Sequence, residues 1–306
     1  METDLFLLEF NNFKKETFRT LEKAFDALNT RGQVKSSNVL NGVLHICVTF
    51  HFSLNRLEFL KESISNVKDL ADTVHLTIVT NVSDSESIKR IQEVLPQDLE
   101  SSQIIFPNLL GHPFFLTWIH YEIFREILAT EKPGDYFLYK EDDITFTSDN
   151  VEYWNEGRSD LKGTLFYPSF VRFEQISDHS PKFLTDVTKR SRIWRLPKVK
   201  INKSRCYVNF VENYQGLYLL DREGLELHLN SKSSHPDNGD WGIREKATRG
   251  LSLHGVPKGY FSRNLVGVNP LSKQIDSRAL IRHLPNNYLE DPNSPHAKVS
   301  LDKCFF

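Results

Sequence analysis

The segment Asp135–Thr147, DYFLYKEDDITFT, decides the fold that this 306-residue sequence predicts. An apolar run, Asp135–Tyr139, leads into three consecutive acids, Glu141, Asp142 and Asp143, and a second apolar stretch follows. Carboxylates that cluster where a buried strand meets a loop repel one another unless a cation or hydrogen-bond donors compensate. The pattern therefore predicts a buried strand that carries three acids to a ligand site at its end.

Upstream of this segment, apolar strands alternate with amphipathic helices. Runs of β-branched and aromatic residues predict strands, and apolar residues three and four apart predict helices. The predicted strands are Val43–Phe52, Thr73–Thr80, Ile104–Phe106 and Asp135–Tyr139, and the predicted helices are Leu57–Val67, Glu86–Val94 and Phe114–Leu128. This alternation is typical of an α/β fold with a parallel sheet, in which ligands bind beyond the carboxyl ends of the strands.

The rest of the chain is expected to extend this core. Apolar residues at helical spacing in residues 1–40 predict an N-terminal helical cap. After residue 150 the periodicity loosens, so 151–306 is expected to be built onto the sheet of 41–150 and to end in a C-terminal strap. Its predicted strands are Leu165–Phe173 and Cys206–Phe210, with short helices within Tyr218–His228 and Trp241–Thr248.

Composition excludes several classes of protein. The 38 Lys and Arg residues nearly balance the 40 Asp and Glu residues, for a formal net charge of -2, so no nucleic-acid partner is expected. Three cysteines are too few for a disulfide framework. No apolar run approaches the roughly 18 residues of a membrane span, and the early acids Glu2 and Asp4 do not fit a basic signal-peptide leader. We expect a cytoplasmic protein without a transmembrane segment, in peripheral contact at most with the inner face of a membrane.

The three acids are of the kind that binds a divalent metal. Mg²⁺ and Mn²⁺ prefer oxygen ligands and often share them with the phosphates of a substrate. A solvated acidic turn is the alternative for an isolated EDD, but this one ends the fourth strand of an alternating pattern. The sequence therefore predicts Mn²⁺ or Mg²⁺ as a cofactor.

These residues resemble a known family. The EDD between apolar runs is similar to the DXD motif of GT-A glycosyltransferases, which bind a nucleotide sugar through a divalent metal. The following SDNVEYW, the upstream helix with Trp118, His120 and Tyr121, and the downstream Gln215–Leu220 (QGLYLL) and Gly239–Arg244 (GDWGIR) resemble segments of inverting N-acetylglucosaminyltransferases of the GnT-I type. The resemblance extends over Val43–Arg263 and lies in motif order and spacing.

The resemblance implies both a fold and an activity. The fold would be a Rossmann-like GT-A domain with a mixed, mostly parallel sheet flanked by helices. Residues 41–150 would bind the nucleotide sugar, and 151–306 would bind the acceptor and carry catalysis. The activity would be metal-dependent transfer of a hexosyl or N-acetylhexosaminyl group from a UDP-sugar to a hydroxyl of a glycan or glycolipid, in polysaccharide biosynthesis.

The resemblance also implies roles for individual acids. Asp143 would bind the metal, and Glu141 and Asp142 would face the ribose or the waters of the metal. Asp240 would be the general base of a single inverting displacement. Gly239 stands where the family tends to have an acid, which leaves two other acids, Asp237 and Glu245, as substitutes for the base.

Further donor-binding residues are expected at the ends of the first strands. His51 and Arg56 follow the first strand and Asn81 follows the second, where GT-A proteins contact the base and ribose. The alternatives are a core histidine and a surface arginine. The segment Lys189–Arg205 has eight basic residues among 17 and no acid. It is either a solvated loop or a lid in which Lys189 and Arg190 bind the diphosphate.

The remaining candidates concern the acceptor and a second metal ligand. Trp194, Tyr214 and Trp241 are expected to contact the acceptor, with Trp194 stacking on a sugar ring. His283 is a candidate metal ligand of the kind that some GT-A families, mostly retaining ones, supply from the C-terminal region. The alternatives to an inverting enzyme are therefore a retaining GT-A enzyme that uses His283 and a carbohydrate-binding or degenerate GT-A module. A nucleotidyltransferase and a metal phosphohydrolase fit less well, because no glycine-rich loop follows the first strand and no paired His/Asp signature accompanies the acids.

Overall fold

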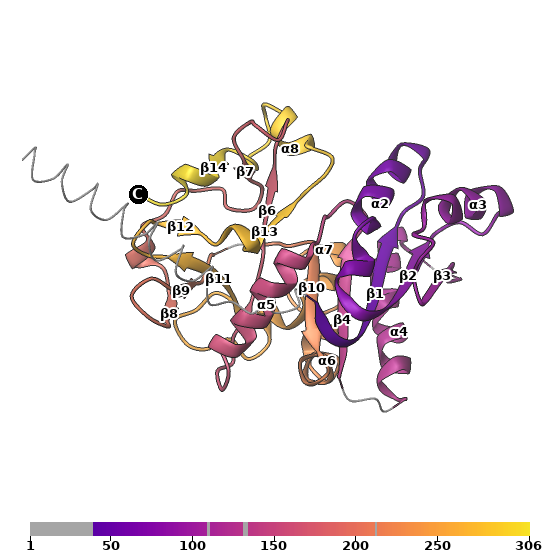
Figure 1. The fold of residues 1–306 in the computed structure, drawn as a ribbon, viewed down its shortest axis with the longest axis horizontal. Helices are drawn as coiled ribbons and strands as arrows, with labels where there is room; N and C mark the ends of the chain where they lie inside the picture. The colour runs from indigo at the N-terminus through magenta and orange to yellow at the C-terminus, as the bar shows by residue number, and fades with distance from the viewer. Residues whose placement is uncertain (1–38, 109–110, 131–133, 212) are drawn as a thin grey trace, which may run out of the picture. The chain divides into compact units, whose positions relative to one another are not determined.

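The computed structural model describes residues 39–306 except 109–110, 131–133 and 212 (Figure 1). The predicted helical cap at 1–40 lies almost wholly outside the described residues. Val39–Phe306 forms one compact unit. None of the helices in the described part of the chain has the length and apolarity needed to cross a bilayer.

A five-stranded sheet forms the core of the first half. Its order is β10-β4-β1-β2-β3, in which β1 to β4 are parallel and β10 runs antiparallel to β4. The strands are β1 (Leu40–Phe50), β2 (Ala71–Thr80), β3 (Ser101–Ile105), β4 (Asp135–Glu141) and β10 (Leu217–Asp221). The prediction of an α/β fold with a mixed, mostly parallel sheet flanked by helices is therefore confirmed.

Helices cover both faces of this sheet, and alternate strand residues face the two layers. The helices are η1 (Leu54–Arg56), α2 (Leu57–Ile64), η2 (Val67–Asp69), α3 (Ser85–Val94), η3 (Pro113–Trp118), α4 (Ile119–Leu128), α5 (Ser148–Asp160) and α6 (Arg222–Leu229). Ile46 and Val48 of β1 belong to one apolar cluster with residues of α2, α3 and α5. Cys47 of β1 and Phe137 of β4 belong to a second cluster with residues of α4 and α6.

The second half adds two small sheets. One has the order β12-β11-β9-β8, with β5 also paired to β11, and the other has the order β13-β6-β7-β14. The strands are β5 (Tyr167–Pro168), β6 (Val171–Glu174), β7 (Phe183–Leu184), β8 (Lys198–Lys200), β9 (Cys206–Val208), β11 (Asn264–Asn269), β12 (Gln274–Ile275), β13 (Leu280–Arg282) and β14 (Val299–Ser300). The helices are η4 (Ile193–Arg195), η5 (Lys232–Ser234), α7 (Ile243–Ala247), η6 (Gly250–Leu253), η7 (Ser277–Ala279), α8 (Asn287–Glu290) and η8 (Leu301–Lys303).

Two predicted elements differ in the structure. The single strand predicted at Leu165–Phe173 is divided into β5 and β6, because its two parts pair with different sheets. The helix predicted at Phe114–Leu128 begins as a 3-10 turn, η3, and continues as α4. The short helix predicted within Tyr218–His228 is confirmed as α6, and the residues before it pair with β4 as strand β10.

The loop after β4 joins the two halves of the chain. Ile144 forms an isolated antiparallel bridge with His283, and the amide of Leu284 donates to the carbonyl oxygen of Asp143 over 2.9 Å. On the other side, the amide of His283 donates to the carbonyl oxygen of Phe173 at 2.9 Å. These backbone contacts bring the end of β13 against the three acids that follow from β4.

Candidate active site

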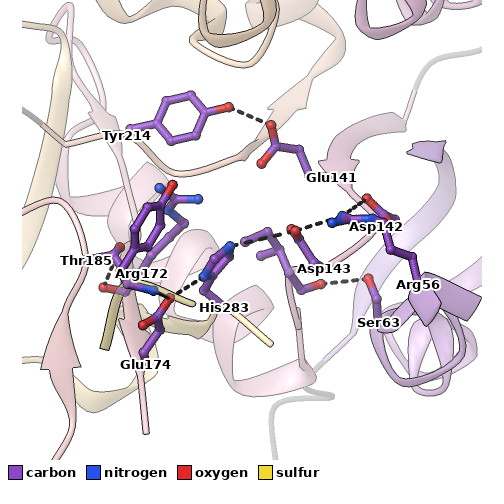
Figure 2. A network of polar contacts seen from close by, with 12 residues as sticks. Arg56, Ser63, Glu141, Asp142, Asp143, Arg172, Glu174, Thr185, Tyr214 and His283 are labelled. Carbon is purple, nitrogen blue, oxygen red and sulfur yellow. Dashed lines mark hydrogen bonds and ion pairs between the residues drawn. The ribbon is translucent and has the colours of Figure 1, made fainter. Parts of the chain in front are cut away.

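The acidic cluster, by which we mean Glu141, Asp142 and Asp143, lies at the carboxyl end of β4 and contacts an arginine from the neighbouring strand's loop. Arg56, in the turn η1 after β1, donates from Nε to Asp142 Oδ2 at 2.9 Å and from Nη2 to Asp142 Oδ1 at 2.6 Å. The same Nη2 donates to Asp143 Oδ2 at 2.9 Å (Figure 2). Arg56 was predicted to bind the donor, and the structure places it against the acids, where it supplies the compensating charge that clustered carboxylates need.

A histidine and a buried glutamate lie on the other side of Asp143 (Figure 2). His283 Nε2 is 3.7 Å from Asp143 Oδ2, and His283 Nδ1 is 2.6 Å from Glu174 Oε1. A carboxylate only accepts hydrogen bonds, so Nδ1 carries the proton and Nε2 faces Asp143. The Glu174 side chain is fully buried and also accepts from the amide of Leu289 at 2.6 Å, which fixes the orientation of the imidazole.

This arrangement fits a divalent metal. Histidines that bind metals usually donate their other ring N–H to a carboxylate or carbonyl, as His283 does to Glu174. Asp143 Oδ1 is buried and has no hydrogen-bond partner among the described residues. No group of three or more His, Cys, Asp or Glu side chains in the described part of the chain is arranged to hold a metal ion. Asp143 and His283 therefore fit as a pair of protein ligands for an ion that takes its other ligands from substrate and water.

Glu141 belongs to a hydrogen-bond network separate from the contacts of Asp142 and Asp143 with Arg56. Tyr214 Oη donates to Glu141 Oε1 at 2.6 Å, and Arg244 Nε of α7 lies 4.0 Å from the same oxygen. The guanidinium of Arg172 lies 4.6 Å over the Tyr214 ring and makes two hydrogen bonds of 2.9 Å to Asp186. The network holds Tyr214, a predicted acceptor residue, against the acidic cluster.

A buried lysine, Lys140, lies in β4 directly before the acidic cluster. Lys140 is fully buried, and its Nζ donates to the carbonyl oxygens of Ser63 at 2.6 Å and Ile144 at 2.8 Å. Burial lowers the pKa of Lys140 to about 7, and the charges of Asp142 and Asp143 oppose that shift. Lys140 thereby ties α2 to the loop that follows the acids.

The pKa values of two carboxyl groups in the cluster, those of Glu141 and Asp143, shift in opposite directions. Burial, followed by the nearby charge of Asp143, raises the pKa of Glu141. Burial would also raise the pKa of Asp143, but the charges of His283 and Arg56 outweigh it, so this pKa lies below its usual value. Of these two carboxyl groups, Asp143, which faces His283, is therefore the more readily ionised.

Two predicted donor-binding residues lie at the same edge of the sheet without contacting the acids. Asn81 Oδ1, after β2, accepts from the amide of Phe52 at 2.8 Å, which links the loops that follow β1 and β2. His51 is exposed in the loop after β1. Its side chain is therefore not the core histidine that was the alternative prediction.

The segment that was predicted to carry the base approaches the cluster through α7. Asp240 and its predicted substitute Asp237 are exposed in the loop before α7, whereas Arg244 within α7 reaches Glu141. Trp241 stacks against Arg249, whose guanidinium carbon is 3.0 Å from the ring centroid. The other substitute, Glu245, accepts from Arg244 Nη2 at 3.2 Å.

Trp241 lines a cavity of about 260 Å³ in the second half of the chain. Phe261 adds a second aromatic side chain, and Asn213 and Asn264 add polar ones. Asn213 directly precedes Tyr214, which connects this cavity along the chain to the Glu141 network. The combination of aromatic and polar side chains is that of a small-molecule site, and the volume lies just below the usual range of about 300–1,000 Å³.

Three predicted residues lie elsewhere. Arg190 Nε donates to the carbonyl oxygen of Lys303 at 2.8 Å, and Ser191 forms a parallel bridge with Phe305. The segment with Lys189, Arg190 and Trp194 therefore lies beside the C-terminal residues, which Figure 1 places away from the β1–β4 sheet. The structure does not bring Lys189 and Arg190 to the acidic cluster; both are exposed, and backbone pairing holds this segment against Phe305.

Several residues of the site were not anticipated from the sequence. Glu174 and Arg172 come from β6, and their positions depend on pairing with β13, so no local pattern marks them. The sequence does mark Lys140 as unusual, because this lysine stands directly before the three acids at the end of the predicted apolar strand Asp135–Tyr139. Arg244 lay within the segment Gly239–Arg244 but was not singled out.

Comparison with known proteins adds no assignment. No protein-family model matches the chain, and no curated protein matches its sequence. Any functional conclusion therefore depends on the arrangement of the residues themselves.

Proposed function

We propose that the protein is a metal-dependent glycosyltransferase that transfers a hexosyl or N-acetylhexosaminyl group from a nucleotide sugar to a hydroxyl of a glycan or glycolipid. One observation carries the proposal: Asp143 faces the imidazole of His283, which Glu174 orients, at the carboxyl end of a parallel strand. Ligands of α/β sheets bind at such ends. A UDP-sugar is the preferred donor because of the resemblance to the DXD motif.

Asp143 and His283 would hold Mn²⁺ or Mg²⁺. When bound, such an ion neutralises the charge that develops on the leaving diphosphate. The pKa of Asp143 lies below its usual value, so this carboxylate is ionised and ready to bind a cation at neutral pH. Arg56 holds the carboxylates of Asp142 and Asp143 in place through three hydrogen bonds.

One basic residue beside the cluster, Arg244, would bind the donor. Arg244 is only partly buried and lies 4.0 Å from Glu141, a position from which it could bind oxygens of the diphosphate. Tyr214 and the aromatic cavity with Trp241 and Phe261 would receive the acceptor, because aromatic faces offer a large apolar surface to a sugar ring.

The base and the stereochemical outcome form a separate part of the proposal. Asp240 is exposed in the loop before α7, which leaves its carboxylate accessible to an acceptor hydroxyl in an inverting displacement. The position of His283 beside Asp143 favours the second candidate, a retaining enzyme that uses His283 as a metal ligand. The anomeric configuration of the first product, measured by NMR, separates the two.

Donor binding by calorimetry tests the function. UDP-, GDP- and CMP-sugars are titrated into the protein with and without Mn²⁺, and into the variants Asp143→Asn and Asp149→Asn. Asp149 is an exposed acid at the start of α5 and serves as the matched control. We expect metal-dependent binding of one donor that Asp143→Asn abolishes and Asp149→Asn preserves. If no donor binds under any metal condition, the proposal is wrong and a carbohydrate-binding module becomes the better account.

A further inference from the structure

A second cavity, of about 450 Å³, lies beside the C-terminal residues. In Figure 1 the C-terminus lies at the end of the described unit away from the β1–β4 sheet, so this cavity is separate from the acidic cluster. We call it the arginine-lined cavity; its lining residues are Arg190, Ser191, Arg192, Arg195, Leu196 and Phe306.

Backbone contacts with the C-terminal segment hold this cavity in shape. The amide of Ser191 donates to the carbonyl oxygen of Cys304 at 2.9 Å, and the amide of Phe306 donates to that of Ser191 at 3.2 Å. The guanidinium carbons of Arg190 and Arg192 each lie 5.3 Å from the centroid of the Phe306 ring. One aromatic ring therefore gathers two cationic side chains at the same place.

The arginines of the cavity have no Asp or Glu partner among the described residues. Arg190, Arg192 and Arg195 form no ion pair with a carboxylate among the described residues, although Arg205 from the same basic segment pairs with Glu156 at 2.8 Å. No Asp or Glu side chain is among the lining residues. Like charges so close together repel one another, and a bound anion would relieve that repulsion.

The guanidinium groups indicate which anion fits. A guanidinium offers a planar fork of N–H donors that matches the oxygens of a phosphate. The cavity volume lies within the range of ligand sites, about 300–1,000 Å³. Trp194 is 57% exposed next to the cavity in sequence, and Lys273 Nζ lies 5.9 Å from its ring centroid, which adds another cation.

We propose that the arginine-lined cavity binds a phosphate group, carried either by a lipid headgroup or by a soluble phosphorylated molecule. Arg190 and Arg192 would donate to the phosphate oxygens, and Phe306 would keep both guanidinium groups in position. This proposal is independent of the glycosyltransferase activity, because it uses no residue of the acidic cluster.

Two binding measurements on the full chain separate the sources of the phosphate. One is calorimetric titration with inorganic pyrophosphate, and the other is cosedimentation with vesicles of phosphatidylcholine with and without phosphatidic acid. Each is repeated with the double variant Arg190→Gln/Arg192→Gln and with Lys89→Gln/Arg90→Gln. The second pair is exposed on α3 and removes the same charge far from the cavity in sequence.

We expect the Arg190/Arg192 variant to bind at least about 10-fold more weakly, because each hydrogen bond between charged partners contributes roughly that factor or more. The α3 control should bind as the wild type does. Binding of pyrophosphate identifies a soluble ligand, and binding only to phosphatidic acid vesicles identifies a lipid headgroup. Should the wild type bind neither probe, or the Arg190/Arg192 variant bind as tightly as the wild type, the proposal is wrong. Arg195→Gln provides a second, independent variant should the double variant fail to fold.

Discussion

The acidic cluster and the arginine-lined cavity both concentrate charge of one sign, but the protein compensates only one of them. Asp142 and Asp143 are buried and paired with Arg56, Asp143 also faces His283, and Glu141 accepts a hydrogen bond from Tyr214. The arginines of the cavity lie at the surface without carboxylate partners among the described residues. The acidic cluster is therefore part of the folded core, whereas the charges of the cavity face solvent or the phosphate group proposed above.

This difference predicts different consequences for mutation. Removal of one partner from a buried ion pair leaves an uncompensated charge in the interior, so the loss of stability is large. Removal of an exposed, unpaired arginine leaves nothing uncompensated. Variants of the two kinds can establish whether burial and pairing, and not the number of charges, decide their effect.

The largest effect is expected at Arg172, which pairs with Asp186 next to the acidic cluster. Both side chains are less than a tenth exposed, and two hydrogen bonds of 2.9 Å join them. Arg172→Met should lower the free energy of unfolding by about 3–5 kcal/mol, because the Asp186 carboxylate remains buried without its partner. Urea denaturation followed by circular dichroism measures the loss.

The control for this variant is an exposed ion pair. Arg90 pairs with Glu86 on the surface of α3 at 3.0 Å, and both side chains are largely exposed. Arg90→Met should cost at most about 0.5 kcal/mol, as is usual for exposed helix pairs. Equal losses in the two variants would show that burial does not govern the worth of arginine pairs in this protein.

The next effect concerns the affinity for Mn²⁺ and is expected at Glu174, which orients His283. If Asp143 and His283 bind Mn²⁺, Glu174→Gln should weaken that binding about 10- to 100-fold, because the amide no longer fixes the imidazole through a charged hydrogen bond. Electron paramagnetic resonance of free Mn²⁺ measures the affinity. Glu290→Gln, an exposed acid at the end of α8, is the control and should bind Mn²⁺ normally. An unchanged Mn²⁺ affinity in Glu174→Gln would mean that His283 does not bind the metal.

A buried ionisable group without a counter-charge extends the comparison. His228 is fully buried, contacts Tyr121 and Ser233 through hydrogen bonds, and has its pKa lowered to about 3 by burial. The unfolded chain, with a pKa near 6.5, binds a proton that the folded chain does not, so stability rises with pH between about 3 and 6.5. In that window the contribution of His228 is up to about 1.4 kcal/mol per pH unit.

Denaturation in urea at pH 5 and pH 7 tests this contribution. The variant His228→Gln removes one titrating group, so its unfolding free energy should fall less than that of the wild type on acidification. His120 is a second buried histidine whose pKa burial lowers, so part of the pH dependence should remain. A variant with the wild-type pH dependence would mean that His228 is not neutral in the folded protein.

The sequence predicted the parallel part of the fold well and the second half poorly. The strands β1, β2 and β4 are rich in apolar, β-branched and aromatic residues, and such segments mark buried parallel strands without any long-range information. The short strands of the second half have two to six residues, and their existence depends on which segment lies beside them. The edge strand β10 shows this, because its Leu217 pairs with Lys140 of β4, 77 positions earlier in the sequence.

The candidate site was predictable to the extent that its residues follow strands. The acidic cluster and Arg56 come after β4 and β1, and the topology of a parallel sheet brings such positions to one edge. Glu174 and the contact between Asp143 and His283 depend on the pairing of β6 with β13, which has no local signature. The position of Lys189 and Arg190 away from the cluster had no local signature either, since it depends on the bridge between Ser191 and Phe305.

The smallest effect on stability is expected in the arginine-lined cavity. Arg190→Gln/Arg192→Gln should change the free energy of unfolding by no more than about 0.5 kcal/mol, since exposed side chains without ion-pair partners contribute little to folding. The loss of the contacts with Phe306 acts against folding, while the relief of repulsion from Arg195 acts in its favour. Urea denaturation in low and high salt distinguishes these contributions, because salt screens only the repulsion. A loss above about 1 kcal/mol would show that the two arginines stabilise the fold, and the cavity would then resemble the acidic cluster in being part of the core.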